Sequence, residues 1–172
     1  LRMNANPSEP TYVELQVTSN FSFLRGGAHP EEFATRAGEL GYPAIAITDC
    51  NTLAGVVRAH LGAKSANTRV IVGSRLEFAD GTPALLCLPT DQQAYSRLSR
   101  LLTQGKRRAQ KAECHLSEAD LFAPDGIFQR GAGQVLIAIP PDEPAEIFSN
   151  FLNRMRGELE SETYLSASHL YR

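Results

Sequence analysis

Two polar loops carry the residues in this chain whose types and spacing could do chemistry. The first loop, residues 18–29, and the second loop, residues 49–55, each follow a short apolar run of strand length. The second loop begins with Asp49 and Cys50, and a carboxylate beside a thiol could supply half of a zinc site. In a parallel α/β sheet, the loops at the carboxyl ends of neighbouring strands lie side by side and form the ligand cleft. We therefore expect the two loops to face one cleft.

Other catalytic arrangements find little support. The chain contains no Walker A, GxSxG or HExxH pattern. Ser19 and Ser22 in the first loop have no histidine positioned by a motif to act as a base, so a Ser-His hydrolase is not supported. No two histidines lie at the spacing of paired metal ligands, and the adjacent Cys114 and His115 would point apart on regular structure. The four histidines are His29, His60, His115 and His169.

Composition indicates an ordinary globular chain. Its 172 residues can form one domain that buries roughly 70% of its unfolded surface. No apolar run approaches about 20 residues and no secretory signal pattern opens the chain, so we expect no membrane association. The formal net charge of −2 gives no support to tight DNA binding by this chain alone, because dedicated nucleic-acid binders are usually basic. Three cysteines without a CxxC pattern (Cys50, Cys87 and Cys114) suggest reduced thiols and a cytoplasmic location.

Apolar runs with strand and helix periods alternate along the chain, which predicts a parallel α/β arrangement. We expect strands at residues 12–17, 44–48, 70–72, 76–78, 85–88, 135–139 and 163–165. We expect helices at residues 30–40, 53–64, 91–104, 117–121 and 142–156. Asp80-Gly81 lies between two strands and suggests a hairpin. Residues 1–10 are expected to form a disordered polar tail.

Local signals predict how these elements begin, end and pack. Val13, Leu15 and Val17 alternate with polar residues and should share one face of the first strand. Thr90 with Gln93 is typical of a capping box, and a stop is expected at Gly105. Two helices have apolar stripes that should be buried. The stripe of the second helix is Leu53, Val56, Val57 and Leu61, and that of the last helix is Ile147, Phe148, Phe151, Leu152 and Met155.

Two longer phrases resemble a known family. Residues 19–26 (SNFSFLRG) and residues 98–109 (LSRLLTQGKRRA) are similar to the polymerase and histidinol phosphatase (PHP) domain at the N-terminus of bacterial C-family DNA polymerases, most of all in the error-prone branch. The resemblance implies a distorted barrel of about seven β/α units, with parallel strands alternating with helices. Residues 11–172 would then be the N-terminal portion of a truncated PHP domain, although an open sheet is the alternative.

The same resemblance implies a phosphoesterase site with three metal ions in active members. Their ligands include His-x-His on the first strand, Asp-His on the second and a later glutamate. These positions fall on Gln16, Thr18, Asp49, Cys50 and Arg75 of this sequence, and Glu77 replaces Arg75 if the register slips. Among the five, Asp49 alone is a good ligand, so no native metal is expected. Asp49 would instead cap a helix or bind backbone N–H groups in its turn.

Two functional hypotheses follow from the resemblance. In the first, this chain is a scaffold within an error-prone polymerase that performs translesion synthesis. The chain is then inactive by itself and needs no cofactor, and Mg²⁺ serves a palm domain that lies elsewhere. In the second, the module keeps a phosphoesterase activity, such as 3′–5′ exonuclease or pyrophosphatase, with Mn²⁺ or Zn²⁺ around Asp49. A free-standing small protein of the same ancestry is a third interpretation. The expected partners are the other polymerase domains, DNA in the full-length protein, accessory mutagenesis proteins, and another copy paired through an exposed sheet edge.

Two further features each have two interpretations. A basic run could contact DNA or another domain, or it could be a solvated surface. The run consists of Lys106, Arg107, Arg108 and Lys111. It contains no aromatic residue, so the sequence gives no indication of a stacking platform for single strands. Phe21 and Phe23 in the first loop could stack on bases, but are expected to anchor the loop in the barrel mouth.

Overall fold

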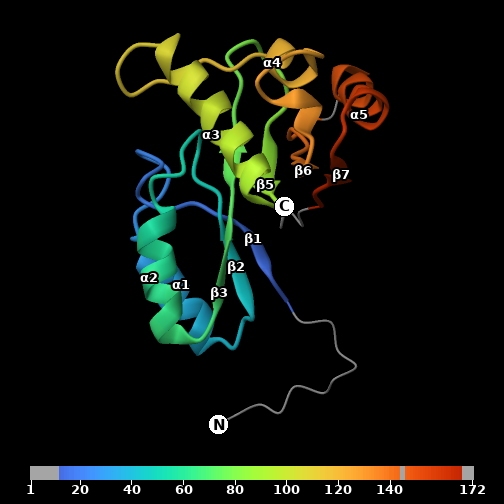
Figure 1. Cartoon of the computed structure of the whole chain (residues 1–172). Helices are drawn as coiled ribbons and strands as arrows, with labels where there is room; N and C mark the ends of the chain where they lie inside the picture. Colours follow the sequence, from blue (N-terminus) through green and yellow to red (C-terminus); the bar gives the residue numbers. More distant parts are fainter. Residues whose placement is uncertain (1–11, 144–145, 168–172) are drawn as a thin grey trace.

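The computed structural model describes residues 12–143 and 146–167 (Figure 1). Its strands are β1 (Glu14–Val17), β2 (Ala44–Ile47), β3 (Arg69–Val72), β4 (Ser74–Leu76), β5 (Leu85–Pro89), β6 (Gln134–Ala138) and β7 (Glu162–Leu165). Its helices are α1 (Pro30–Glu39), α2 (Val56–Ala66), α3 (Gln92–Arg107), α4 (Glu118–Phe122) and α5 (Glu146–Glu158), with a 3₁₀ turn at Gln129–Gly131. The tail predicted at residues 1–10 and His169 lie outside the described residues.

The strands form two sheets that continue one another. Strands β1, β2 and β3 are parallel, in that order. The second sheet has the order β4-β5-β6-β7, in which β5 is antiparallel to both of its neighbours and β6 is parallel to β7. An isolated parallel bridge between Cys50 and Arg75 joins the two sheets at the second loop. The predicted hairpin is therefore present, and it introduces the antiparallel strand into an otherwise parallel arrangement.

Helices cover the outer faces of both sheets. In Figure 1, α1 and α2 lie beside β1–β3, and α3, α4 and α5 surround the sheet that contains β5–β7. Ile45 and Ile47 of β2 pack with the first pair of helices, while Ala46 between them belongs to an inner cluster with Leu86 and Ile137. This alternation along a buried strand is what a partial barrel requires, because one face of each strand packs on helices and the other faces the interior.

The first strand does not present its apolar residues on one face. The register with β2 shifts between Glu14 and Val17, as at a β-bulge. Val17 consequently joins the outer cluster beneath α1 and α2, whereas Leu15 packs against the inner cluster. The prediction that these two side chains share a face is wrong, because one extra residue in a strand reverses the alternation beyond it.

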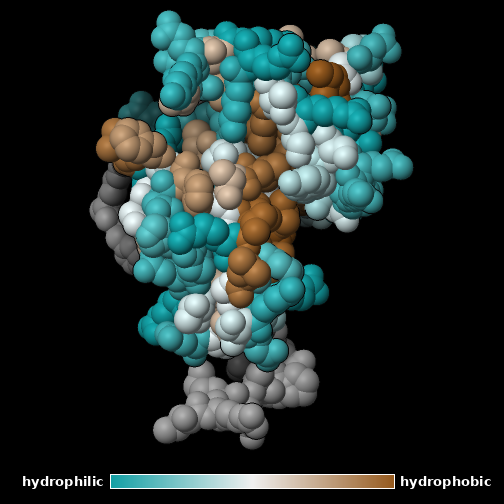
Figure 2. Space-filling view, turned by 60° about the vertical axis from the view of Figure 1, so that its left-hand side comes forward, coloured by the Kyte–Doolittle hydropathy of each residue, from teal (hydrophilic) through white to brown (hydrophobic). Residues whose placement is uncertain are grey.

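Small residues, and not the predicted apolar stripe, bury helix α2. Ala59 and Ala63 form its buried face, while Val57 and Leu61 are 69% and 60% exposed. The two helices pack closely because a Cβ atom at Gly38 of α1 would lie only 2.2 Å from the carbonyl oxygen of Ala66. Val57 and Leu61 therefore stay open to solvent. On the face of the molecule seen in Figure 2, an apolar band has hydrophilic surface on both sides.

Helix α3 begins and ends differently from the prediction. The N-cap is Asp91, whose carboxylate accepts a hydrogen bond from the N–H of Ala94 at 2.7 Å, whereas the Thr90 hydroxyl donates to the carbonyl of Gly133. The helix also continues through Gly105 to Arg107. A Cβ atom at Gly105 would lie 2.6 Å from Leu116 Cδ2, so the glycine allows a close contact instead of ending the helix. Lys106 is thereby held on a regular last turn.

Candidate functional site

Asp49 is the centre of a buried hydrogen-bond network that joins the two loops. Its side chain follows β2 and is only 1% exposed. Oδ1 accepts from the backbone N–H of Ser19 and from the Ser22 hydroxyl, both at 2.7 Å, and Oδ2 accepts from the Ser19 hydroxyl at 2.7 Å. A carboxylate with three close donors is strongly stabilised in place. Asp49 thus binds a backbone N–H group, but this group belongs to Ser19 of the first loop and not, as predicted, to the turn of Asp49 itself.

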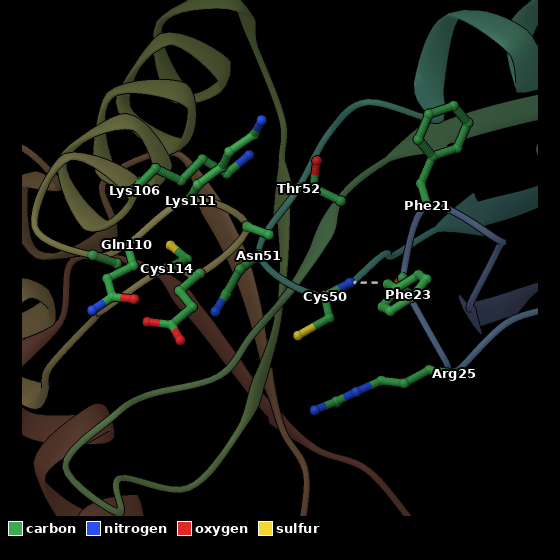
Figure 3. A pocket seen from close by; sticks show the side chains of 14 residues that line it. Phe21, Phe23, Arg25, Cys50, Asn51, Thr52, Lys106, Gln110, Lys111 and Cys114 are labelled. Atoms are coloured by element: carbon green, nitrogen blue, oxygen red, sulfur yellow. Dashed lines mark hydrogen bonds between the residues drawn. The ribbon is translucent and has the colours of Figure 1, made fainter.

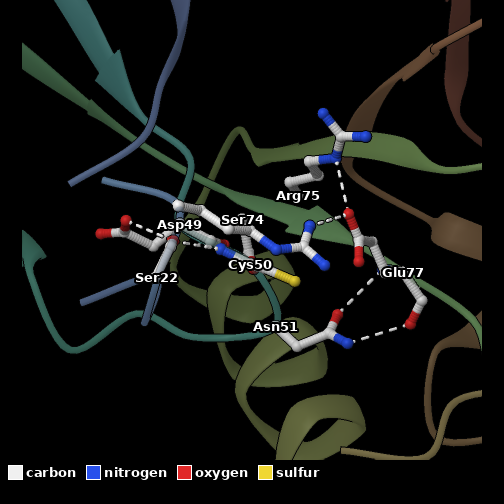
Figure 4. Close-up of polar contacts among 8 residues, drawn as sticks. Ser22, Asp49, Cys50, Asn51, Ser74, Arg75 and Glu77 are labelled. Atoms are coloured by element: carbon white, nitrogen blue, oxygen red, sulfur yellow. Dashed lines mark hydrogen bonds and ion pairs between the residues drawn. The ribbon is translucent and has the colours of Figure 1, made fainter. Parts of the chain in front are cut away.

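Ser22 and Ser74 extend this network. The Ser22 hydroxyl, which donates to Asp49, also accepts from the backbone N–H of Cys50 at 2.9 Å, and the Ser74 hydroxyl donates to the Asp49 carbonyl at 2.9 Å (Figure 4). Both serines are buried. The first loop, the second loop and β4 are therefore fixed to one another around a single carboxylate.

The Cys50 thiol is half-buried beside this network. Burial, and then the nearby negative charge of Glu77, raise the pKa of the Cys50 thiol to about 11. The thiol consequently keeps its proton near neutral pH. Because the thiolate is the form that binds metals and attacks electrophiles, Cys50 is poorly suited to either task in this environment.

Arg75 and Glu77, the two alternatives for one ligand position, lie in the same charge cluster. The Glu77 carboxylate accepts a hydrogen bond from Arg25 of the first loop. It also lies 3.1 Å from Arg75 Nε, with which it forms an ion pair but no hydrogen bond. The hydrogen bond from Arg25 is the main cause that holds the pKa of Glu77 below its usual value. Asn51 fixes the backbone of Glu77 through two hydrogen bonds of 2.9 and 3.0 Å. The cluster thus neutralises its own carboxylate.

The first-strand positions do not join Asp49. Gln16 is exposed in a groove between β1 and β7, and Thr18 is only partly buried. Neither side chain hydrogen-bonds to Asp49 in the part of the chain that the structure describes. Over residues 12–143 and 146–167, no three His, Cys, Asp or Glu side chains are grouped closely enough to hold a metal ion. Asp49, Cys50 and Arg75 are therefore brought together, and Gln16 and Thr18 are not.

An open cavity of about 680 Å³ lies beside the two loops (Figure 3). We call it the loop pocket. The first loop contributes Phe21, Phe23 and Arg25 to one wall. The other wall is formed by Lys106, on the last turn of α3, and by residues 109–114 of the connector between α3 and α4. The second loop lies between them with Cys50, Asn51 and Thr52. The first loop and the basic run are separate features of the sequence, and the fold places the first loop and two residues of the run, Lys106 and Lys111, on opposite walls of one cavity.

The basic run is divided between two surfaces. Lys106 and Lys111 line the loop pocket, whereas Arg107 and Arg108 line a separate groove with Arg100. Arg108 also forms an ion pair of 2.8 Å with Asp120. The four residues therefore do not act as one patch.

The two phenylalanines differ from the prediction that they anchor the first loop. Phe23 is 85% exposed and Phe21 is 38% exposed, so the prediction is wrong for Phe23. The loop is anchored instead by the hydrogen bonds of Ser19 and Ser22 to Asp49. Sequence reasoning also missed Asn51 and Cys114 as pocket residues, because no local pattern signals a residue that acts through a distant segment.

Comparison with known sequences then decides the family. Residues 14–157 match the family described as the PHP domain. The chain belongs to the PHP domain family. PHP-containing proteins named error-prone DNA polymerase are similar to most of it. That of Caulobacter vibrioides is 49% identical over 162 residues, which are 94% of this chain and 14% of the polymerase. That of Brucella abortus is 42% identical over 160 residues, covering 90% of this chain and 14% of the polymerase. The PHP chain thus spans about a seventh of the length of these curated relatives.

Solved structures confirm the expected PHP-type fold. A Bifidobacterium adolescentis protein, provisionally assigned as a metal-dependent phosphoesterase, superposes with a TM-score of 0.63 at 14% identity, over 92% of this chain and 77% of that one. An amidohydrolase from Chromobacterium violaceum, solved with bound sulfate and no metal, gives a TM-score of 0.58 at 15% identity, over 88% of this chain and 75% of that one. At such identities the likeness concerns the fold alone. No helix in the described part of the PHP chain has the length and apolar character needed to cross a membrane.

Proposed function

We propose that this chain is the N-terminal PHP module of an error-prone DNA polymerase, and that it serves the polymerase as a scaffold whose metal centre has been lost. The 42–57% identity to proteins of that name supports the assignment to this kind of polymerase. Nucleotide transfer in translesion synthesis would then be performed by other domains, with Mg²⁺ in the palm. The partners of this module would be those domains, accessory mutagenesis proteins and DNA, in the cytoplasm.

The occupied carboxylate of Asp49 is the observation that carries the loss of the metal centre. Its donors, Ser19 and Ser22, lie where a cation would otherwise approach the carboxylate. The residues beside it do not fit a metal cluster either, because Cys50 keeps its proton and Arg75 is a cation. Two like charges about 4 Å apart repel by roughly 4 kcal/mol at intermediate dielectric. A cluster of cations would have to displace both serines and tolerate Arg75.

A scaffolding role follows from what the network does in place of metal binding. In a metal site the ligands of several loops are held together by the ions. Here the hydrogen bonds of Asp49 and the Glu77 cluster connect the same elements, namely both loops and β4. The mouth of the barrel can therefore keep a fixed shape without a cofactor.

Elemental analysis of the purified chain tests this proposal, together with a phosphatase assay in added Mn²⁺ or Zn²⁺. We expect less than stoichiometric metal and no turnover above the blank. Asp49→Ala should lower stability and leave both readouts unchanged, and Asp125→Ala, at an exposed loop position, is the matched control. Stoichiometric metal together with turnover that disappears in Asp49→Ala would instead establish the alternative, a residual metal-dependent phosphoesterase.

A further inference from the structure

The loop pocket combines an exposed aromatic ring with cations from a segment 80 residues away. Figure 3 shows Phe23 and Arg25 on the side of the first loop, opposite Lys106 at the end of α3 and Lys111 in the connector that follows it. The basic run itself contains no aromatic residue, so the sequence gives no indication of a stacking platform for single strands. The fold supplies the ring from the other wall.

The charges on the pocket walls favour an anionic ligand. The described wall residues include three cations, Arg25, Lys106 and Lys111, against one carboxylate, Glu113. Arg25 is partly neutralised by Glu77, and Glu113 lies 3.3 Å from His115 Nε2. Within the described residues, the Lys106 and Lys111 ammonium groups form no ion pair and no hydrogen bond to the protein. Two free ammonium groups can therefore meet phosphates without first breaking a contact.

The backbone of the loop that carries Phe23 is held in place, while the ring itself is 85% exposed. The first loop is fixed by Ser19 and Ser22 on Asp49, and its backbone closes through hydrogen bonds from Arg25 and Gly26 to the Ser22 carbonyl. A Cβ atom at Gly26 would lie 2.2 Å from the Ser19 carbonyl oxygen, so the turn is tightly packed. A ligand that stacks on Phe23 therefore does not have to order the loop backbone, and less conformational entropy is lost on binding.

We infer that the loop pocket binds single-stranded nucleic acid, with a base stacked on Phe23 and the flanking phosphates held by Lys106 and Lys111. Aromatic rings beside a positively charged groove are the usual means of binding single strands without sequence preference. The cavity of about 680 Å³ lies within the range of ligand pockets. A protein partner is less favoured, because it would be expected to cover the exposed apolar side chains of the loop together. Leu24, which is 89% exposed beside Phe23, does not line the pocket. The inference depends on the pocket alone and not on the loss of the metal centre.

Fluorescence anisotropy with labelled oligo(dT) of about 12 nucleotides tests the inference on the purified chain. Phe23→Ala should weaken binding by about 5- to 150-fold, the range of one base–aromatic stack, and Phe23→Trp should restore it. The neighbouring Leu24→Ala is the matched control, because Leu24 is 89% exposed in the same loop but does not line the pocket. Lys106→Ala should reduce the slope of log K against log[salt] by about 0.7, while Arg107→Ala, one residue along the same helix, should leave the slope unchanged.

Several results would overturn the inference. One is the absence of binding at about 100 μM protein and low salt, a condition in which even non-specific nucleic-acid binding is detectable. The second is an equal loss of affinity in Phe23→Ala and Leu24→Ala. The third is equal affinity for the single strand and for a duplex of the same length. Far-UV circular dichroism of each variant ensures that the comparison is between folded proteins. None of these measurements involves metal. The single-strand inference can therefore fail while the proposed scaffolding role holds, and the scaffolding role can fail while the inference holds.

Discussion

The Ser19 hydroxyl donates a hydrogen bond of 2.7 Å to Asp49 Oδ2, across 30 residues of sequence and in a site closed to solvent. The contact connects the ends of two parallel strands, where the ligands of a metal centre would meet. It shows how this fold can hold its loops together with protein donors alone. The consequence is that the stability of the barrel mouth should depend on hydroxyl groups and not on added ions.

Ser22→Ala should destabilise the chain, because it removes a donor from a buried carboxylate and an acceptor from the Cys50 N–H. Hydrogen bonds to charged groups contribute about 1.5–3 kcal/mol, so a loss in that range is expected in the free energy of unfolding. Urea denaturation followed by circular dichroism measures it. Ser65→Ala, on the exposed face of α2, should stay within about 0.5 kcal/mol of the parent protein. Equal midpoints for both variants would contradict the role assigned to Ser22.

The Cys50 thiol should react slowly with iodoacetamide at neutral pH, with a reaction midpoint near the raised pKa of about 11. A Cys114→Ser variant isolates the reaction, since the remaining Cys87 is fully buried. Alkylation measured by mass spectrometry as a function of pH gives the midpoint, and the same protein in urea should return to the ordinary value of 9.0. The folded protein binds the Cys50 proton more tightly than the unfolded protein does. The protonated thiol therefore contributes to the free energy of unfolding in full below pH 9, and this contribution is lost as the pH rises toward 11. A midpoint at or below 9 in the folded protein would refute it.

The sequence predicts the order of strands and helices well, and it fails where burial depends on close backbone approach. The apolar run Ala44–Ile47 is a strand buried on both faces, as its composition indicates. Val57 and Leu61 follow a helical stripe as clearly, yet α2 buries Ala59 and Ala63 because Gly38 allows α1 to approach. Periodicity counts apolar residues and cannot foresee that small ones will provide the contact.

The candidate site was predictable in its positions but not in its connections. The family pattern pointed to Asp49, Cys50 and Arg75, and the fold brings them together. That Ser22 donates to the Asp49 carboxylate, or that Phe23 and Lys106 line one pocket, depends on loop conformations with no local sequence signal. The bulge in β1 is a similar case, since one shifted residue decides which face Leu15 occupies.

Acid should weaken the fold through Glu77. Its pKa is lowered, chiefly by the hydrogen bond from Arg25, so its contribution is present above the unfolded value of about 4.5 and is lost as the pH falls through the lower folded value. Glu77→Gln should therefore lower the melting temperature at pH 7 more than at pH 3, with a loss of up to about 1 kcal/mol for this partly exposed pair. Thermal melts at the two pH values measure the difference. Glu39→Gln, which breaks the exposed pair with Arg36, is the control and should show a smaller pH dependence. A Glu77→Gln effect that is the same at both pH values would be inconsistent with this ion cluster.

Two glycines in helices should respond to alanine with opposite signs. Alanine favours an exposed helix over glycine by about 0.5–1 kcal/mol, so Gly157→Ala in α5, where a Cβ meets no atom within 4 Å, should stabilise the chain. Gly105→Ala in α3 should destabilise it by about 1–3 kcal/mol, because the new Cβ would lie 2.6 Å from Leu116 Cδ2 and 2.7 Å from Cys114 Sγ. Urea midpoints of the two variants decide the matter. If Gly105→Ala were stabilising, Gly105 would only weaken the helix and would not be needed for close packing. The connector after α3, which contributes to one wall of the loop pocket, would then pack less closely against α3 than this structure shows.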